Sequence, residues 1–367
     1  MTINYGIIGC GMMGGEHIRN IKLLDGARVT ALTDPIAENM DEAVQIAGND
    51  CRTFDSIGQL LKSGSCDALV IASPNHTHHE ILRELSGCGL PILAEKPLCI
   101  TLDQCRSVSE VFGKNNAPVW VAMEYRYIAP VTKLISALRD GEAGILRMLS
   151  IREYRYPFLE KFGDWNRFSE KSGGTMVEKC CHFFDLMRLI IKSEPVRIYA
   201  SGGMDVNHVD EVYDGSRPDI LDNAYVIVDF ANGVRALIEL CMFAESAPWQ
   251  ERVTAIGDAA SIEARVPGPA RFSASGEERH AELEIAYRED QRVDVQTVEV
   301  DHSILAAGDH HGSTFFQHQR FIDMVRNGGK PAVSLQDGML AVAMGQAAEE
   351  SVMTGEAIDF QEFLDRQ

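Results

Sequence analysis

Two patterns of hydrophobic and polar positions divide this chain. In roughly its first third, short apolar or β-branched runs alternate with longer stretches of helical periodicity. The apolar runs predict strands at residues 5–9, 28–33, 68–72, 91–94 and 119–122, and the stretches between them predict helices at 14–24, 37–47, 76–87 and 102–112. This alternation is typical of a parallel sheet with helices on both faces, so we expect residues 1–122 to form a doubly wound α/β domain.

A different pattern begins after residue 122, where long alternating segments dominate. These segments predict strands at 145–156, 196–201, 223–230, 234–242, 252–256, 259–266, 281–287 and 293–300. Asn232-Gly233, between two of them, is a strong signal for a hairpin turn. Helical segments at 313–327 and 335–354 follow. We expect residues 123–367 to form an α+β domain with a large, mostly antiparallel open sheet, and the last helix to pack on one of the two domains.

Composition narrows the class of protein. The chain has 367 residues, 45% of them hydrophobic and 24% charged, which is enough apolar sequence for two cores. The formal net charge is −20 and no basic run occurs, so we expect no nucleic-acid partner. The nine cysteines lack the spacing of a disulfide scaffold and are predicted to be reduced. Without signal-peptide features or an apolar stretch of roughly 20 residues, we expect a cytoplasmic protein with no membrane contact.

A glycine-rich motif follows the first predicted strand. The sequence Gly9-Cys10-Gly11-Met12-Met13-Gly14 has the G-x-G-x-x-G spacing, in which glycines allow a tight turn and a close approach of the backbone to a pyrophosphate. Asp34 ends the next strand, twenty residues beyond Gly14, where a carboxylate would accept hydrogen bonds from an adenosine ribose. A carboxylate at this place disfavours a 2′-phosphate, so NAD is favoured over NADP.

The predicted strand at 68–72 ends in Ser73-Pro74-Asn75, followed by His76, His78 and His79. Three histidines so close together suggest a metal, but no cysteine or acidic cluster accompanies them. We therefore interpret this stretch as a loop on the nicotinamide side of the cofactor. Its predicted cofactor contacts are Ser73, Pro74, Asn75 and His78.

Lys96 is the most informative single residue. It lies in Glu95-Lys96-Pro97, directly after the buried strand at 91–94, and the carboxyl ends of such strands are where open α/β sheets bind ligands. Glu95 and Lys96 are therefore predicted to lie beside the cofactor, and Lys96 to take part in the reaction.

A second reactive segment runs from Ser172 to Asp185. If it is one helix, Glu178, His182 and Asp185 share a face, and a carboxylate one turn before a histidine can fix its tautomer. The preceding Gly173-Gly174 indicates a close approach of the backbone to another group. Cys180-Cys181 point in different directions on a helix and have no second ligand pair, so we expect no metal site.

Together these motifs resemble the Gfo/Idh/MocA family of NAD(P)-dependent sugar and polyol dehydrogenases. The resemblance extends over nearly the whole chain, through Gly9–Gly14, residues 73–76, Glu95-Lys96-Pro97, residues 173–185 and a C-terminal helix at 315–327. It implies a Rossmann domain followed by an α+β domain, and homodimers or homotetramers formed through the outer face of the second sheet. Family members usually carry Asp where this chain has Glu178, so the reach of that carboxylate to His182 is in question.

The predicted reaction is hydride transfer between NAD and a secondary alcohol carbon of a sugar, a cyclitol or a sugar derivative. Lys96 and His182 are both candidates for the proton-transfer group, with Glu178 orienting His182. Side chains that combine aromatic faces with polar edges suit a sugar ring. The predicted substrate contacts are Tyr125, Arg126, Tyr127, Tyr154, Trp165, Arg167, His182 and His311.

Two alternatives use the same fold. Transient oxidation of a sugar, elimination and re-reduction would cleave a glycoside with no net redox change. A regulator that binds dinucleotide or sugar without turnover is the other alternative, and the presence of both Lys96 and His182 argues against it.

Overall fold

The computed structural model of the protein describes residues 2–48, 50–113, 117–269, 272, 276 and 279–366. The chain divides into two units. Unit 1 comprises Met1–Tyr127 and Asp301–Val342, and unit 2 comprises Ile128–Val300 and Ala343–Gln367. Each unit has its own sheet and is described by itself.

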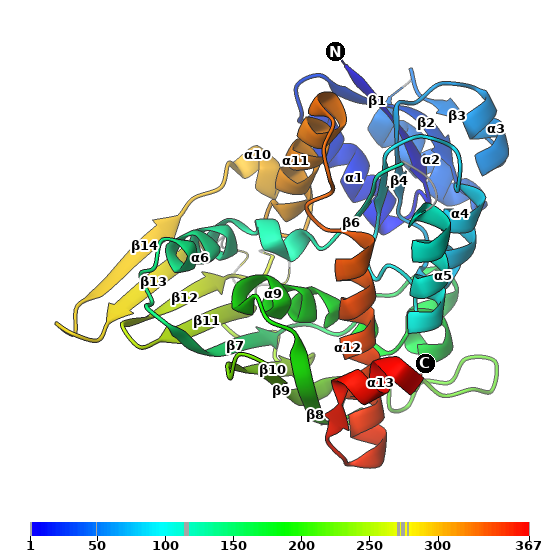
Figure 1. The fold of residues 1–367 in the computed structure, drawn as a ribbon. Coiled ribbons are helices and arrows are strands. Elements are labelled where there is room, and N and C mark those ends of the chain that lie inside the picture. The colour runs from blue at the N-terminus through cyan, green and yellow to red at the C-terminus, as the bar shows by residue number, and fades with distance from the viewer. Residues whose placement is uncertain are drawn as a thin grey trace. The chain divides into compact units, whose positions relative to one another are not determined.

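Unit 1 is built on a parallel six-stranded sheet (Figure 1). The sequence predicts a parallel sheet and five of these strands, and it misses the two-residue strand at Arg52–Thr53. Its strands are β1 (Ile3–Ile8), β2 (Ala27–Thr33), β3 (Arg52–Thr53), β4 (Ala68–Ile71), β5 (Ile92–Ala94) and β6 (Val119–Val121), in the order β3-β2-β1-β4-β5-β6. The order reverses between β1 and β4, so the carboxyl ends of these two strands flank the topological switch point. Ligands of doubly wound sheets bind at that point.

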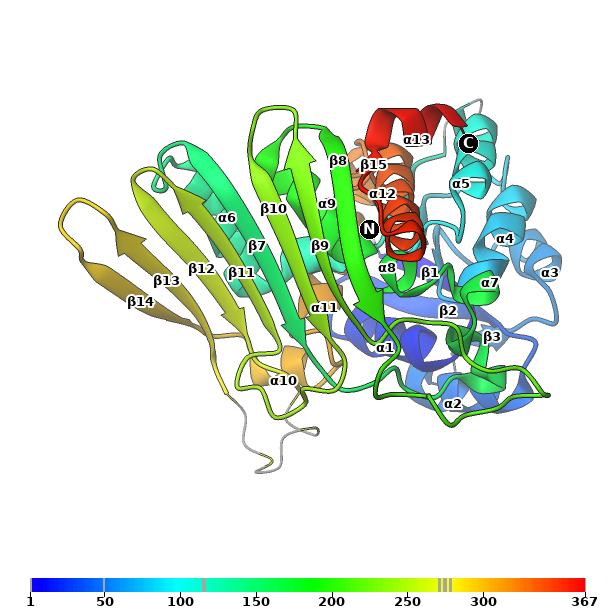
Figure 2. The same ribbon diagram turned by 90° about the horizontal axis from the view of Figure 1, so that it is seen from below.

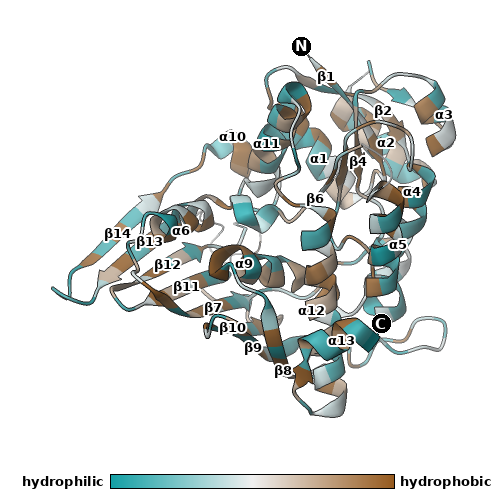
Figure 3. Cartoon of the chain, viewed as in Figure 1, coloured by the Kyte–Doolittle hydropathy of each residue, from teal (hydrophilic) through white to brown (hydrophobic). Residues whose placement is uncertain are grey.

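Helices cover both faces of this sheet. They are α1 (Met12–Lys22), α2 (Ala37–Ala47), α3 (Ile57–Lys62), α4 (His78–Glu84) and α5 (Leu102–Gly113), with the 3₁₀ turns η1 (Asn75–Thr77) and η2 (Glu124–Tyr127). Strands covered on both faces lose the alternation of polar and apolar residues. Every residue of β4 and β5 is buried accordingly, and β4 is hydrophobic along its length in Figure 3.

Residues 301–342 complete unit 1, whereas the sequence pattern assigns everything after residue 122 to the second domain. They form α10 (His302–Leu305), α11 (Ser313–Asn327) and the first part of α12 (Leu335–Thr354). Phe321 on α11 is fully buried between the rings of Tyr5 and Trp120. Arg126 donates a hydrogen bond to the carbonyl oxygen of Ala332, at 2.8 Å. Apolar and polar contacts together hold this late segment against the first sheet.

Unit 2 contains a nine-stranded mixed sheet, which confirms the prediction of a large and mostly antiparallel sheet (Figure 2). The strands are β7 (Leu146–Tyr154), β8 (Pro195–Gly203), β9 (Asn223–Phe230), β10 (Arg235–Cys241), β11 (Glu251–Gly257), β12 (Ala260–Val266), β13 (Ala281–Tyr287), β14 (Val293–Val298) and β15 (Ile358–Asp359). Their order is β14-β13-β12-β11-β7-β10-β9-β8-β15, and β7 and β10 are its one parallel pair of neighbours among the described strands.

Helices pack on one face of the second sheet (Figure 2). The helices of unit 2 are α6 (Ala129–Arg139), α7 (Ser169–Ser172), α8 (Thr175–Glu178), α9 (Cys181–Ile191), α13 (Phe360–Arg366) and the 3₁₀ segment η3 (Phe162–Arg167), with the last part of α12. α6 packs on β12 and β13, and α9 packs on β7. On β7, Leu149, Ile151 and Glu153 point into the covered face, and the alternate residues point to the open face. The open face carries Tyr225 and Ile227, which are 57% and 47% exposed.

Two further expectations concern the chain as a whole. All nine cysteines lie among the described residues, and none forms a disulfide. In the part of the chain that the structure describes, no helix is both long and apolar enough to span a bilayer.

Candidate functional site

The glycine-rich turn between β1 and α1 is shaped by two close backbone approaches. Gly9 has φ +90°, and a Cβ there would lie 2.5 Å from the backbone nitrogen of Ser73. A Cβ on Gly14 would lie 2.2 Å from the carbonyl oxygen of Gly9. A Cβ on Gly11 would meet only the side chain of Asn39, at 3.7 Å. The first two glycines are therefore required by the fold, whereas Gly11 leaves open space at the N-terminus of α1.

Asp34 lies directly beside this turn. Its Oδ2 accepts a hydrogen bond from the backbone N–H of Cys10 at 2.6 Å, and its Oδ1 accepts one from Ile36 at 2.7 Å. The amide of Asn39 lies 3.4 Å from both carboxylate oxygens. These contacts fix the orientation of Asp34 next to Gly11. A turn open to a pyrophosphate, with a carboxylate beside it, fits the dinucleotide NAD.

The segment after β4 is held from within. The hydroxyl of Thr77 donates to the hydroxyl of Ser73 at 2.7 Å. His78 is fully buried, with Nδ1 2.8 Å from the carbonyl oxygen of Pro97 and Nε2 3.0 Å from that of Ser73. Burial lowers the pKa of His78, so the neutral ring donates to one of these carbonyls. His78 thus joins the Ser73 turn to the Pro97 turn, and its contact with the cofactor stays a prediction.

Lys96 follows β5 at the carboxyl edge of the parallel sheet. Its backbone N–H donates to Glu95 Oε2 at 3.2 Å, and Glu95 Oε1 lies 3.0 Å from His17 Nε2. Burial would raise the pKa of Glu95, but the hydrogen bond from His17 and the charges of His17 and Lys96 outweigh burial and hold it below its usual range. Glu95 is therefore an ionised and fully engaged carboxylate beside Lys96.

A second buried carboxylate, Glu16, precedes His17 on α1. Its Oε1 accepts from His310 Nδ1 at 2.8 Å and from the Thr314 hydroxyl at 2.9 Å, and Asp309 N–H lies 3.4 Å from its Oε2. Burial opposes ionisation, but the charge and hydrogen bond of His310, with Thr314, lower the pKa of Glu16 to about 2. Glu16 thus binds the 308–314 segment to α1.

Glu124 shares Thr314 with Glu16. The Thr314 hydroxyl lies 2.6 Å from Glu124 Oε2, and its single hydrogen serves one carboxylate at a time. Burial raises the pKa of Glu124, and the charges of Glu95 and Glu16 add to this effect. Glu16, Glu124 and His310 are the one group of metal-ligating side chains within 4.8 Å that the described residues form. Because protein donors already occupy the oxygens of Glu16, this arrangement needs no metal.

In unit 2 the expectation that one helix carries Glu178, His182 and Asp185 is wrong. α8 ends at Glu178 and α9 begins at Cys181. At the break, the backbone N–H of Cys180 donates to Thr175, five residues earlier, at 3.3 Å. Glu178 and His182 therefore lie on opposite sides of a helix break, while His182 and Asp185 share α9. All three are buried.

The two glycines before α8 serve a contact within the protein. Gly173 and Gly174 have φ +90° and +84°, and a Cβ on Gly174 would lie 2.5 Å from Glu349 Oε1. The same oxygen accepts the backbone N–H of Met176 at 2.9 Å. Burial raises the pKa of Glu349 to about 7, helped by the charge of Asp219 and opposed by the Met176 hydrogen bond. The sequence indicated a close approach here, and the group approached is a carboxylate of the chain itself.

A charged cluster on the covered face of the second sheet was not predicted. Lys179 Nζ, at the break between α8 and α9, lies 2.9 Å from Glu153 Oε1, and Arg155 lies 3.5 Å from the same oxygen. Burial raises the pKa of nearby Glu251 to about 7, and the charge of Glu153 adds to it. One signal was available in the sequence, because Glu153 occupies an inward position of β7 where alternation calls for an apolar residue.

The predicted substrate contacts of unit 2 lie in different environments. Tyr154 is on the open face of the sheet, where its hydroxyl donates to Glu239 at 2.5 Å. It therefore does not share the face on which α9 carries His182. Arg167 is buried, with Nε 3.2 Å from Glu211 and Nη2 3.3 Å from the carbonyl oxygen of Phe158. Arg167 therefore links its own segment to the loops that carry Glu211 and Phe158. Trp165, another predicted contact, lies two residues before it in η3.

The predicted contacts of unit 1 are mostly internal. Tyr125 and Tyr127 are buried in η2, and the guanidinium of Arg320 stacks over the Tyr127 ring at 4.8 Å. Arg126 is engaged by the carbonyl of Ala332. His311 has φ +50° and follows His310 in the segment that wraps Glu16.

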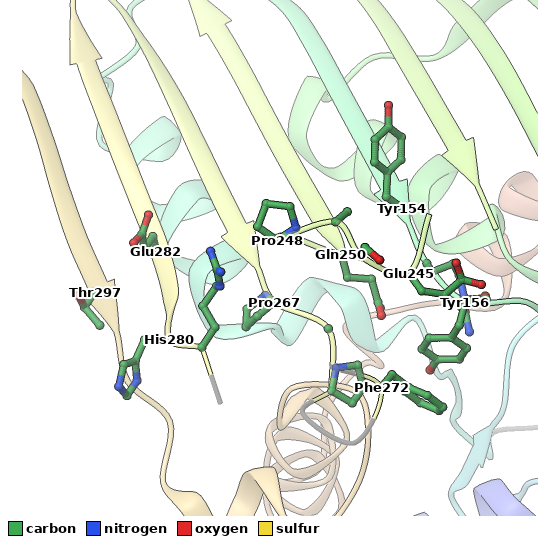
Figure 4. A pocket seen from close by; sticks show the side chains of 16 residues that line it. Tyr154, Tyr156, Glu245, Pro248, Gln250, Pro267, Phe272, His280, Glu282 and Thr297 are labelled. Carbon is green, nitrogen blue, oxygen red and sulfur yellow. Dashed lines mark hydrogen bonds between the residues drawn. The ribbon is translucent and has the colours of Figure 1, made fainter. Parts of the chain in front are cut away.

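Unit 2 has a cavity of about 730 Å³ at the carboxyl end of β7 (Figure 4). Tyr154 and Arg155 line it together with residues of the 245–250 and 267–280 segments. The ring of Tyr156 stacks on that of Phe272, with centroids 3.8 Å apart. Tyr154 is the one predicted substrate contact among the residues that line this cavity. Its volume suits a small organic molecule.

Comparison with known families now decides the class of protein. Residues 3–123 match the model of an oxidoreductase family described as "NAD-binding Rossmann fold", and residues 135–360 match its "C-terminal alpha/beta domain". The chain belongs to the Gfo/Idh/MocA oxidoreductase family. It is an NAD-binding dehydrogenase, as its motifs predict.

Several members of the Gfo/Idh/MocA family resemble the whole chain. Inositol 2-dehydrogenase of Rhizobium meliloti strain 1021 is 24% identical over 96% of this chain and 97% of its own length. Myo-inositol 2-dehydrogenase of Thermotoga maritima is 24% identical over 98% and 99%. Rhizopine catabolism protein MocA of Rhizobium meliloti is 28% identical, over only 52% of this chain and 57% of that protein. A structure of levoglucosan dehydrogenase with NADH superimposes with a TM-score of 0.81 at 20% identity, over 98% and 99% of the two chains.

The different surroundings of Gly9, Gly11 and Gly14 give a direct test of whether the glycine-rich turn binds the pyrophosphate of NAD. Gly11→Ala should weaken NADH binding at least tenfold without changing the melting temperature, because its new methyl group enters the open space and meets no backbone. NADH fluorescence titration measures the first effect and thermal unfolding the second. Gly58→Ala, in an open position on α3, is the matched control and should leave NADH affinity unchanged. Unaltered NADH affinity in Gly11→Ala would show that the pyrophosphate does not bind at this turn.

Glu349 should make stability depend on pH. Its pKa is raised in the folded state, so the wild-type protein loses stability as the pH rises from about 4.5 towards 7, and Glu349→Gln lacks this loss. Between pH 5.5 and pH 8 the variant should gain on the order of 2 kcal/mol over the wild type in urea unfolding. Glu350→Gln, one residue later, should show no such gain. A difference between Glu349→Gln and wild type that does not vary with pH would contradict the raised pKa.

Proposed function

We propose that the protein oxidises a secondary alcohol carbon of a cyclic polyol, either a cyclitol or a sugar, with NAD as the hydride acceptor. One observation carries the proposal. Lys96 lies at the carboxyl edge of the parallel sheet, just after β5, and the open turn of Gly11 lies at the same edge, just after β1. A positively charged side chain at this edge is suited to hydrogen-bond an alcohol oxygen and to stabilise the negative charge that develops on it.

The relatives support the polyol class. Two of them, which match this chain over nearly their full length, are named as inositol 2-dehydrogenases. The levoglucosan dehydrogenase structure has the same fold. Inositol and levoglucosan both present several hydroxyl groups on a ring. A ring of hydroxyl-bearing carbons is the shared chemistry that we assign to the substrate.

The chain's own groups divide the work of the reaction. Gly11 and Asp34 would bind the pyrophosphate and the adenosine ribose, and NAD when bound supplies the hydride acceptor. Lys96 and His182 are the two candidates for the group that takes the hydroxyl proton. Lys96 is half-buried and His182 is buried. Glu178, on the other side of the helix break, is the proposed partner that orients His182.

We further propose that the protein assembles as a homo-oligomer through the open face of its nine-stranded sheet. Large apolar side chains occupy that face on neighbouring strands: Met148, Tyr199, Tyr225, Ile227 and Ile256 are all exposed. Tyr199 and Ile227 lie directly opposite each other on β8 and β9. A contiguous exposed apolar patch on a sheet is typical of a subunit interface.

Replacement of Lys96 tests the proposed reaction. Lys96→Ala should reduce turnover by a factor of about 1,000 or more and change NADH affinity less than about threefold, because the side chain acts on the alcohol oxygen and not on the adenosine half of the cofactor. Turnover is followed by NADH absorbance with a panel of cyclitols, aldoses and anhydro sugars, using NAD and NADP in parallel.

Lys62→Ala, which removes an exposed lysine on α3, is the matched control and should behave as wild type. A Lys96→Ala enzyme with near-normal turnover would refute the role of Lys96. A wild-type enzyme that binds NADH but oxidises no member of the panel would refute the polyol class.

The oligomer proposal is tested by charging the open face. Tyr225→Glu combined with Ile227→Glu should convert the assembly to monomers in light scattering after gel filtration, because two buried carboxylates would face the partner subunit. Met353→Glu, at a residue 79% exposed on α12, is the control and should leave the assembly intact. A wild-type monomer, or an assembly unaffected by the double substitution, would overturn this interface.

A further inference from the structure

A chain of buried hydrogen bonds leads from helix α11 to Lys96. His318 on α11 places Nε2 2.8 Å from His17 Nδ1, and His17 Nε2 lies 3.0 Å from Glu95 Oε1. Glu95 Oε2 accepts the backbone N–H of Lys96 at 3.2 Å. His17, His318 and Glu95 are all buried. Four residues from three separate parts of the sequence thus form one line of contacts.

The chemistry of the groups fixes the direction of the hydrogen bond at Glu95. An ionised carboxylate only accepts, so His17 carries a proton on Nε2 and donates it to Glu95. Between His17 Nδ1 and His318 Nε2, one ring donates and the other accepts. Burial, with a smaller contribution from the charge of His17, lowers the pKa of His318 well below its usual range, so the ring of His318 is neutral. A neutral ring can take either role, so His318 holds the orientation of His17 whichever way this second hydrogen bond runs.

We propose that His17 is a positioning residue for Lys96. His318 orients His17, and His17 in turn fixes the ionised carboxylate of Glu95 beside the lysine. The proposal rests on the function assigned above, in which Lys96 acts on the alcohol oxygen. His17 lies on α1, the helix whose N-terminus faces the open turn at Gly11. One helix would then both receive the cofactor phosphates and set the charge environment of the reacting lysine.

The competing role for His17 is purely structural, as a polar group that joins α1 to α11. The ring of Tyr5 packs edge-on against His318, with centroids 5.5 Å apart, and its hydroxyl has no hydrogen-bond partner among the described residues. Tyr5→Leu therefore removes the ring and disturbs the packing of the same junction, while leaving the line of hydrogen bonds intact. This gives a matched control for the structural role.

Several other titratable groups surround this line and must stay constant in the test. His310, from the 308–314 segment, and Lys96 act on Glu95. Glu124 on η2 and His78 on α4 feel the charge of Glu95, and Glu16 on α1 interacts with His17. None of them is replaced in the variants below. A change in the titration of Lys96 then reports on the line from His17 to Glu95.

The experiment measures the titration of Lys96 without knowledge of the substrate. The full-length protein, saturated with NADH, is labelled briefly with acetic anhydride at a series of pH values, and the acetylated fraction of the Lys96 peptide is measured by mass spectrometry. Glu95→Gln should shift the midpoint for Lys96 to lower pH by about one unit, because an adjacent negative charge has been removed. His17→Leu should shift it in the same direction, because Glu95 loses its donor and takes up a proton.

Two comparisons separate positioning from structure. Addition of His17→Leu to Glu95→Gln should produce no further shift, because His17 acts through the carboxylate. His17→Gln, whose amide still donates to Glu95, should restore the wild-type midpoint, and Tyr5→Leu should not move it. Should His17→Leu fail to fold, His318→Leu removes the next ring in the line and should give a smaller shift in the same direction.

The proposal is overturned if Glu95→Gln leaves the titration midpoint of Lys96 unchanged. It is also overturned if Glu95→Gln shifts that midpoint but neither His17→Leu nor His318→Leu shifts it. It is likewise overturned if His17→Leu and Glu95→Gln shift it additively. Failure of the proposed function has a different signature, namely normal turnover in Lys96→Ala with the titration shifts unaltered.

Discussion

The need to satisfy buried polar groups at one helix junction organises much of unit 1. Glu16 and His17 lie side by side on α1, and both are buried, which would be costly if either lacked partners. Their partners come from the 308–318 segment, through His310, Thr314 and His318, and from Glu95 after β5. The glycine at 308 is part of this arrangement, since a Cβ there would lie 2.2 Å from the carboxyl carbon of Glu16. These contacts explain why a late segment of the chain belongs to the first sheet.

The pattern of apolar residues was sufficient to predict both sheets except for their two-residue edge strands, β3 and β15. Period-two alternation in the second half and continuous apolar runs in the first give the other strands to within a few residues, because each pattern follows from how many faces of a sheet are covered. Helix α6 was missed, although Val131, Leu134 and Ala137 are buried at helical spacing within it. The separation of α8 from α9 was also missed, because no proline or glycine marks the break at residues 179–180.

The candidate site was only partly predictable. Motif spacing is local, so the glycine-rich turn, Asp34 and Lys96 could be found from the sequence. His17 and His318 are separated by 301 positions, and no local pattern could pair them. At Gly174 the sequence correctly indicated a close approach to another group. It could not identify that group, because Glu349 lies far along the chain. Tyr154 was assigned by residue type, and the alternation of β7 places it on the face opposite to α9.

The discontinuous makeup of unit 1 also constrains the order in which the protein can be completed during synthesis. Residues 1–127 are synthesised before residues 128–300 of unit 2, and His310, Thr314 and His318, which contact Glu16 and His17, follow only after them. Until then, Glu95 is the one available partner among those described above. Completion of the dinucleotide-binding unit therefore has to wait for the synthesis of residues 128–300.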